Sequence, residues 1–579
     1  MEQQRLFLIL MLGMISVMMY FEWQKDYGPQ PQTEITQSGT TGSDLPQTAP
    51  SQTSIIDEGM PVPQSGPSVS AAPTPSTATT GTSTTSLGKI ITVETDVMRV
   101  QIDTQGGSVK VVDLVKYPVS VDEPDHAFRL MDVSKERNFN AQNGFHISKN
   151  DSQLRAMTPT PKTVYVTAQD HYSMDGENLV VDLTWSNRMG MTFVQRYTFT
   201  KGSYAIDLTH EVVNGTGRAW SGHSYVRLER TPSESEGGLS MLPTYTGAVY
   251  YSPKNKYDKI DFDDIEDSKK PGQKGYFDAI NSEFAGGWIA MIEHYFVGAF
   301  VPPKDDVYRY FTHKPSGGNR YWIGMMSTEK TIPAGQKQAT SLQFYVGPKI
   351  QKDLEALAPG LELSVDYGWL TFISKPLFWL LDWIHSYIGN WGWAIILLTI
   401  LIKLAFYKLS EASYKSMARM KKLAPRMKQI SERYADDRQR KGQAIMEMYK
   451  KEKVNPLGGC LPILIQIPVF IALYYVLLES VELRQAPWAF WLNDLSIKDP
   501  YFVLPILMGA SMFFQQKLNP PPPDPMQAKM MMMLPFVFTV LFLFFPSGLV
   551  LYWVVNNLLS IAQQYYITRV VMSETRARD

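Results

Sequence analysis

The sequence predicts a multi-domain protein, in which an α-helical polytopic membrane part with six transmembrane helices is joined to a large β-sandwich. With 579 residues the chain exceeds what one hydrophobic core usually organises. The mean hydropathy is only -0.17, yet apolar runs gather in the first 22 residues and again after residue 365. The stretch between them alternates apolar and polar residues, which is typical of half-buried strands. Different parts of the chain therefore suit different solvents.

Charge and cysteine content exclude several classes of function. The net charge is -1 at pH 7 and the pI is about 6.7, so no global basic field favours nucleic acid as the main partner. Cys460 is the single cysteine, which excludes an intrachain disulfide framework and a cysteine-based zinc site. It ends a Leu-Gly-Gly-Cys string like a lipoprotein box, but such boxes act behind an N-terminal signal. We expect no cofactor and no metal.

Residues 1–23 are predicted to form an N-terminal membrane anchor. An apolar run at 6–21 follows Arg5 and ends in aromatic residues, which suit the membrane interface. No small-residue cleavage site follows, which favours a retained anchor over the alternative, a removable signal peptide. Residues 24–88 are rich in Pro, Ser, Thr, Gln and Gly and cannot bury enough surface to offset chain entropy. This stretch is predicted to be a disordered linker.

Residues 89–350 are predicted to form the β-sandwich domain. Short runs with Thr, Val and Tyr alternate with a period of two and are interrupted by Gly, Asn and Asp, as in antiparallel strands with one buried face. A domain of this size suits one large sandwich. The clearest runs are at 163–167, 179–185, 192–200, 205–213 and 224–229.

Residues 351–388 are predicted to form connecting and interfacial helices. A short helix is expected at 354–361. The stretch 373–385 combines an apolar face with a Trp-rich rim, which suits a helix lying in the headgroup plane and bracing the sandwich against the bilayer. A core helix of the soluble domain is the alternative.

Residues 389–570 hold the remaining five predicted spans. Residues 408–453, which follow the first of them, carry fourteen Lys or Arg against six Asp or Glu, so the positive-inside rule places this segment in the cytoplasm. Counting the predicted spans outward from this segment places both termini, including the tail 571–579, in the cytoplasm. The same count places the β-domain in the periplasm. The five spans are expected at 391–409, 460–481, 501–517, 530–545 and 548–567.

A cytoplasmic helical hairpin is predicted at 411–455. Apolar residues recur every three or four positions from 420 to 434, a polar break follows at 435–437, and a second helical stretch runs to 449. The basic surface of the hairpin would contact anionic lipid headgroups or ribosomal RNA. A solvated topology signal is the equally open alternative.

Lys403 lies about twelve residues into the span at 391–409, where a charge costs roughly 2.5 to 3.5 kcal/mol on insertion scales. It either snorkels to the cytoplasmic surface or faces a hydrated cavity. Polar groups avoid lipid unless they face protein or water, so polar residues in other spans favour the cavity, although bonds between helices explain some of them. These residues are Thr399, Gln466, Ser511, Gln515, Thr539, Asn556, Asn557, Ser560 and Gln563.

Several strings are specific to one family. They are Gly-Asn-Trp-Gly at 389–392, Lys-Val-Asn-Pro-Leu-Gly-Gly-Cys-Leu-Pro at 453–462, Gln-Ile-Pro at 466–468, Ser-Val-Glu-Leu-Arg at 480–484 and Phe-Pro-Ser-Gly-Leu-Val-Leu-Tyr at 545–552. On these residues the sequence resembles the YidC/Oxa/Alb membrane insertases, densely over about the last 210 residues. The anchor, linker and β-domain resemble the layout of Gram-negative members.

The resemblance implies a five-helix insertase core around a hydrophilic groove, open to the cytoplasm and to lipid, and a galactose-mutarotase-like supersandwich for the β-domain. A family arginine in the groove corresponds to Lys403, which keeps the charge but not the bidentate geometry. Lys408 stands where proline is frequent, and Trp553 where tyrosine is frequent. A client's polar tail would enter the groove while its apolar helix slides along the third and fifth spans.

Two sets of site residues follow. The groove contacts are expected from Lys403, Thr399, Gln466, Ser511, Gln515, Trp553 and Asn556. The slide is expected from Pro468, Met508, Met530, Met533 and Phe536. The methionines suit it because flexible thioether side chains adapt to unlike apolar surfaces, and ordinary lipid-facing methionines are the equally open alternative.

We therefore predict a non-enzymatic insertase and chaperone of the bacterial inner membrane, acting alone or with the Sec translocon. Expected partners are nascent inner-membrane proteins, the Sec translocon, anionic lipids and the ribosome, the last through the hairpin and the C-terminal tail, with no small-molecule substrate. A sugar-processing enzyme would need a paired histidine and carboxylate in a cleft, but His210 and Glu211 are adjacent in a strand and point to opposite faces. A transporter would show inverted repeats and buried ion ligands, and the sequence has neither.

Overall fold

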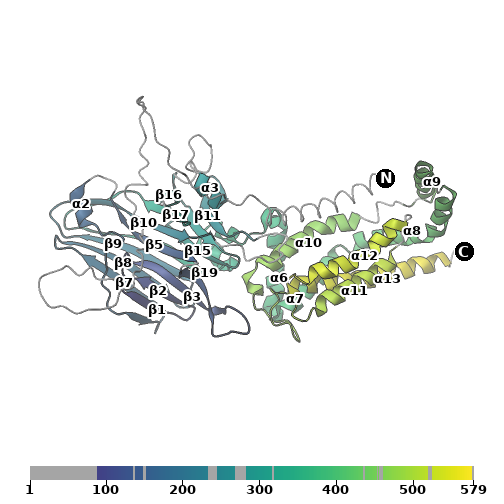
Figure 1. Ribbon diagram of the computed structural model, residues 1–579, viewed down its shortest axis with the longest axis horizontal. Helices are drawn as coiled ribbons and strands as arrows, with labels where there is room; N and C mark the ends of the chain where they lie inside the picture. Colours follow the sequence, from purple (N-terminus) through teal and green to yellow (C-terminus); the bar gives the residue numbers. More distant parts are fainter. Residues whose placement is uncertain are drawn as a thin grey trace, which may run out of the picture.

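The computed structural model has a β-domain at one end and a bundle of helices at the other (Figure 1). The expected anchor at 1–23 and the expected linker, except for its last residue, lie outside the part of the chain that the structure describes. So does Cys460. The described residues are 88–134, 137–147, 151–232, 244–267, 282–315, 318–434, 437–452, 454, 461–519 and 525–576.

Two sheets face each other in the β-domain, which confirms the predicted sandwich. The smaller sheet is antiparallel throughout and has eight strands. Its order is β12 (Lys256–Ile260), β11 (Gly247–Ser252), β14 (Trp288–Ile292), β15 (Phe296–Val301), β19 (Lys337–Pro348), β9 (Ala205–Asn214), β8 (Met191–Thr200) and β7 (Asn178–Ser186).

The larger sheet has eleven strands, and only its β1–β6 pair is parallel. Its order is β13 (Glu283–Ala285), β16 (Val307–His313), β17 (Tyr321–Ser327), β10 (Trp220–Arg230), β5 (Asn138–His146), β4 (Ala127–Val133), β3 (Ser108–Pro118), β2 (Met98–Asp103), β1 (Ile90–Glu94) and β6 (His171–Ser173), with β18 (Lys330–Ile332) paired to β10.

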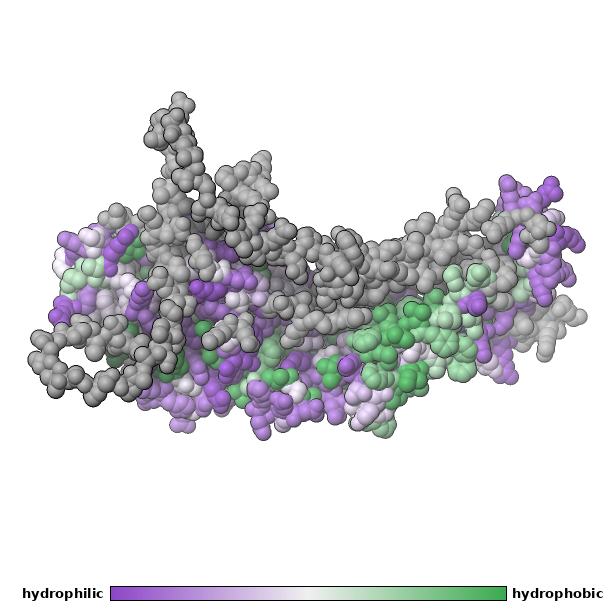
Figure 2. Space-filling view, viewed as in Figure 1, coloured by the Kyte–Doolittle hydropathy of each residue, from purple (hydrophilic) through white to green (hydrophobic). Residues whose placement is uncertain are grey.

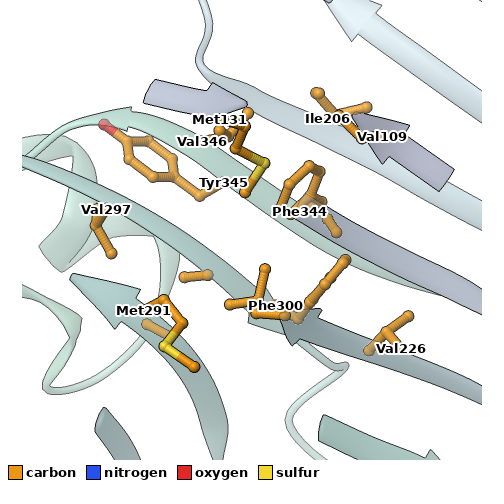
Figure 3. Close-up of a cluster of buried hydrophobic side chains, with 14 of the residues drawn as sticks. Val109, Met131, Ile206, Val226, Met291, Val297, Phe300, Phe344, Tyr345 and Val346 are labelled. Carbon is orange, nitrogen blue, oxygen red and sulfur yellow. The ribbon is translucent and has the colours of Figure 1, made fainter. Parts of the chain in front are cut away.

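Apolar side chains from both sheets fill the space between them (Figure 3). Val109 and Met131 come from the larger sheet, and Ile206 and Phe344 come from the smaller one. All four are at most 1% exposed. The Phe300 and Phe344 rings stack with their centroids 4.5 Å apart, which adds to the burial of two large side chains.

Four of the five expected strand runs are confirmed as β7, β8, β9 and β10. The expectation for 163–167 is wrong, because this segment makes only two isolated bridges. Val164 pairs with Gln105 beside the larger sheet, and Val166 pairs with Thr184 in the smaller sheet. The segment crosses from one sheet to the other, so pairing lasts for a single residue on each side.

Helices α5 (Gln351–Leu357) and α6 (Thr371–Ile388) connect the β-domain to the bundle. The expected helix at 354–361 begins earlier and ends at Leu357, and Gly360 beyond it has a φ of 79°. Helix α6 is amphipathic as predicted. Phe378, Leu381 and Ile384 belong to the buried core of the bundle, whereas Trp379 is 66% exposed. Contact of the exposed aromatic face with a bilayer stays a prediction.

The bundle contains helices at all five expected spans, with shifted ends. The first ends earlier than expected, because α7 bends by 67° into the next helix, α8 (Tyr407–Arg433). Taken alone, none of the described helices combines the length and the apolar composition that a crossing requires, and α7 with α8 does so only as this bent pair. The count of six spans stays a prediction. The five helices are α7 (Trp391–Ala405), α10 (Leu461–Glu479), α11 (Val503–Leu518), α12 (Pro525–Phe542) and α13 (Ser547–Arg576).

The predicted helical hairpin is formed by α8 and α9 (Arg438–Lys451). Helix α9 begins where expected, because the Asp437 carboxylate accepts hydrogen bonds from the backbone N–H groups of Gln439 and Arg440. Hydrophobic residues gather over the bundle, whereas hydrophilic residues cover much of the β-domain and the end at α9 (Figure 2).

The segment after α10 joins the two parts of the molecule. Val481 is 1% exposed and belongs to the core of the β-domain, whereas Leu483, in the same 3-10 turn, belongs to the core of the bundle. Arg484 donates to the Pro118 carbonyl at 2.7 Å, at the end of β3. His294 Nε2 lies 2.9 Å from the Leu478 carbonyl. Attachment of the β-domain therefore involves this turn as well as the expected interfacial helix.

Candidate functional site

A cavity of about 330 Å³ lies among the helices of the bundle. Helices α7, α8, α10, α11, α12 and α13 all contribute side chains to it. The lining residues are Lys403, Ser410, Ser413, Tyr414, Met417, Gln466, Ile467, Phe470, Met512, Gln515, Gln516, Asn519, Met531, Leu534, Pro535, Tyr552, Trp553, Asn556, Asn557 and Ser560.

Lys403 brings a positive charge to the cavity wall. It occupies the last turn of α7, where the negative end of the helix dipole favours a cation. The side chain is half-buried, and its Nζ donates to Ser560 Oγ on α13 at 2.7 Å. Among the described residues, no carboxylate lies within ion-pair distance of this ammonium group.

Uncharged polar groups continue the wall from α10 to α13. Gln466 Nε2 donates to Asn556 Oδ1 at 3.1 Å, and the Ser560 hydroxyl donates to the Asn556 carbonyl at 2.7 Å. Trp553 packs edge-on against Phe470, with ring centroids 4.7 Å apart. The cavity therefore combines a cation and amides with aromatic walls, and could accommodate a segment with both polar and apolar side chains.

Most of the expected groove residues come together at this cavity: Lys403, Gln466, Gln515, Trp553 and Asn556 line it. Whether they touch a client stays a prediction.

Thr399 and Ser511 do not line the cavity, and their contact with a client stays a prediction. The Thr399 hydroxyl donates to the Ile395 carbonyl at 2.7 Å, and the Ser511 hydroxyl donates to the Met508 carbonyl at the same distance. Both side chains are at most 5% exposed. The Ser511 hydroxyl also accepts from Asn557 Nδ2 at 3.1 Å. A short hydroxyl side chain can donate to its own helix, so its presence in a span does not show which way it faces.

The expected slide residues divide in a similar way. Met530, Met533 and Phe536 on α12 are 38%, 55% and 59% exposed, and Pro468 on α10 is half-buried. Met508 is fully buried in the core of the bundle, so its assignment to an exposed slide is wrong. The exposed face of α11 passes through neighbouring positions, because successive helix residues point about 100° apart.

The sequence interpretation missed the contribution of α8. Residues 410, 413, 414 and 417 line the cavity, and this spacing places them on one helix face. The last three lie in the predicted hairpin at 411–455 and the first lies just before it, so the sequence does not connect their polar and aromatic character with the spans. The helical period alone would have revealed their common face.

The β-domain lacks the arrangement that a sugar-processing site would need at His210. His210 is 2% exposed and Glu211 is half-buried, on opposite faces of β9, as predicted. Burial lowers the pKa of His210 to about 4. The cavity beside it measures about 20 Å³, enough for about one water. The His210 Nε2 lies 2.8 Å from Asn143 Oδ1.

Comparison with known proteins covers nearly the whole chain. The family described as 60Kd inner membrane protein matches residues 383–575, and the family described as YidC periplasmic domain matches residues 90–380. The membrane protein insertase YidC of Azotobacter vinelandii is 46% identical over 578 residues, covering 99% of both chains. That of Nitrosococcus oceani is also 46% identical over 578 residues, covering 99% of this chain and 100% of the other.

Two solved structures are also similar. An active YidC insertase with its first transmembrane domain resolved aligns over 83% of this chain and 95% of its own, at 16% identity and a TM-score of 0.37. A galactose mutarotase related enzyme from Lactobacillus acidophilus aligns over 44% of this chain and 97% of its own, at 9% identity and a TM-score of 0.30.

The matches confirm the resemblance drawn from the sequence. The relatives are membrane protein insertases, and the match extends over nearly their full length. The matched families are described as an inner membrane protein and a periplasmic domain. The protein is accordingly non-enzymatic and resides in the bacterial inner membrane. On this evidence the chain belongs to the YidC family of membrane protein insertases.

Proposed function

We propose that this insertase receives the polar segment of a client in the cavity beside α7 and α13, with Lys403 as the cationic contact. The observation that carries the proposal is a half-buried ammonium group whose partner, Ser560, is neutral. A charge without a carboxylate partner among the described residues is free to attract one from a client.

The cavity would shorten the distance over which a polar segment of the client crosses hydrocarbon. A polar segment that crosses hydrocarbon loses its hydration, whereas a polar cavity supplies replacement partners for part of the way. Two unit charges 4 Å apart interact with about 1 kcal/mol in water and about 4 kcal/mol at an effective dielectric constant of 20. Lys403 would therefore attract an acidic residue more strongly in the cavity than in solution.

The apolar part of the client would leave along α12. Met533 and Phe536 expose more than half of their surface there, and Met530 lies on the same helix. Thioether side chains fit unlike apolar partners because they are flexible and polarisable. This surface lies next to the cavity, since Met531 and Leu534 of the same helix line it.

The finer partners belong to the same proposal. The basic helices α8 and α9 are the part of the described chain that we assign to ribosomes and anionic lipids, and cooperation with the Sec translocon is expected from the kind of client. The division into an anchor at 1–23, a linker at 24–88, a β-domain at 89–350, connecting helices at 351–388 and an insertase core at 389–570 is likewise our proposal.

Reconstitution in liposomes tests the role of Lys403. The measurement is the initial insertion rate of a small single-span client with an acidic tail, and of the same client with a neutral tail. We expect Lys403→Ala to slow the acidic client roughly 5-fold to 100-fold, and Lys403→Arg to preserve most of its rate. The neutral client should be unaffected. If Lys403→Ala inserts the acidic client at the wild-type rate, the proposal is wrong.

A further inference from the structure

We infer that Ser560 is a positioning residue that holds the Lys403 ammonium group at the cavity wall. The inference rests on the proposed function of Lys403 and adds a second residue to it. A lysine ammonium on a flexible four-carbon stem takes many positions unless a partner fixes it. Ser560 Oγ, 2.7 Å from Nζ, is the partner that the structure provides.

The serine is oriented to accept a hydrogen bond. Its hydroxyl has one proton, which it donates to the Asn556 carbonyl one turn earlier in α13, at 2.7 Å. The remaining lone pairs of Oγ are therefore available to donors. Ser560 is only 3% exposed, so water competes little for them. Lys403 thus meets an acceptor whose direction is fixed before the ammonium arrives.

Ser560 connects two helices beside a third. Lys403 of α7 donates to it across the contact between α7 and α13, and Tyr414 of α8 lines the same cavity. The 67° bend between α7 and α8 falls just after Lys403, so α8 leaves the direction of α7 at this point. The position of the positive charge therefore depends on a residue of α13.

The geometry leaves the cation able to bind. An ammonium group has three donors, and Ser560 accepts one of them. The other two suit the oxygens of a client carboxylate, for which charge-assisted hydrogen bonds are the strongest. An acidic replacement of Ser560 would instead neutralise the charge. A neutral acceptor holds the lysine in place and keeps its charge available.

A double-mutant cycle tests the inference with the two clients described above. The proteins are wild type, Ser560→Ala, Lys403→Ala and the double variant. We expect Ser560→Ala to slow the acidic client about tenfold, the size of effect of one hydrogen bond to a charged group, and to leave the neutral client unchanged. In the Lys403→Ala background, the second substitution should add nothing, because the group that it positions is gone.

Three further variants separate positioning from packing. Ser560→Thr keeps the hydroxyl and should insert the acidic client at close to the wild-type rate. Ser560→Cys keeps the size but accepts hydrogen bonds weakly, so it should behave like Ser560→Ala. Ser374→Ala is the matched control, because this buried serine donates to the Ala472 carbonyl and does not line the cavity.

The outcomes separate the two proposals. A wild-type rate for Ser560→Ala beside a slow Lys403→Ala overturns positioning and leaves the proposed function standing. A wild-type rate for Lys403→Ala overturns the proposed function. Equal slowing of both clients by Ser560→Ala, or slowing that simply adds to that of Lys403→Ala, shows a packing effect and overturns positioning.

Discussion

Replacing His294 by glutamine is predicted to make the protein less sensitive to acid. His294 lies between β14 and β15, and its Nε2 is 2.9 Å from the Leu478 carbonyl at the end of α10. A carbonyl only accepts, so this nitrogen carries the proton and donates. Burial, with a smaller contribution from the nearby Lys349 charge, lowers the pKa of His294 to about 4.

The magnitude follows from the difference between the folded and unfolded pKa. The unfolded histidine binds a proton below about pH 6.5, whereas the folded one stays neutral down to about pH 4. The unfolded state therefore binds more protons between these values, and the free energy of unfolding falls as the pH falls through them. Acidification from pH 7.5 to pH 5 should therefore lower the free energy of unfolding by about 2 kcal/mol through this one residue.

Thermal unfolding of the purified full chain, followed by tryptophan fluorescence at pH 7.5 and pH 5, measures the effect. Glutamine can still donate to the Leu478 carbonyl but does not titrate. On acidification the melting temperature of the wild type should fall by roughly 4 to 8 °C more than that of His294→Gln. His171→Gln, at a histidine with 60% of its side chain exposed, should lose as much as the wild type. Equal losses in His294→Gln and wild type would refute the reasoning.

Four other substitutions test local packing and capping, one of them as a control. Arg484→Ala removes the donors to backbone carbonyls at the end of β3 and should lower the free energy of unfolding by about 2 to 3 kcal/mol in denaturant titrations. Gly392→Ala would place a methyl group 2.1 Å from Trp488 Cδ1 and should cost about 1 to 3 kcal/mol, while Gly442→Ala, with open space around it, should be neutral or stabilising. Asp437→Ala removes the N-terminal cap of α9 and should lower the local stability of its first turn by about 1 kcal/mol. Faster amide hydrogen exchange in that turn measures the loss.

Strand prediction succeeded where one face of a strand is buried and the other is not. Along β8, buried residues alternate with half-buried or exposed ones over the whole strand, so the period of two is visible in the sequence. In β14 and β17 every residue is buried, and no alternation remains to be found. The failed segment at 163–167 has alternating residues, but its pairing depends on partners far away in the chain.

The site was predictable where a side chain is too long or too charged to satisfy itself. Lys403 and Gln466 cannot complete their hydrogen bonds on their own helix turns, so they require a polar space, and both line the cavity. Thr399 can satisfy its hydroxyl locally, and the sequence does not distinguish the two cases. Ser560 has such a local bond and still accepts from the lysine, which only the packing of α13 against α7 reveals.

The turn that holds both Val481 and Leu483 has a consequence for biogenesis. The chain is made from its N-terminus, so β19 is complete long before Val481 exists, and until then the hydrophobic core of the β-domain lacks this side chain. With α10 as the predicted membrane span, insertion in the wrong direction would place this valine on the opposite side of the membrane. We therefore expect a chain truncated before residue 481 to carry a periplasmic domain that proteases cut faster than the full-length one. Completion of the sandwich would then report that the following helix has the correct topology.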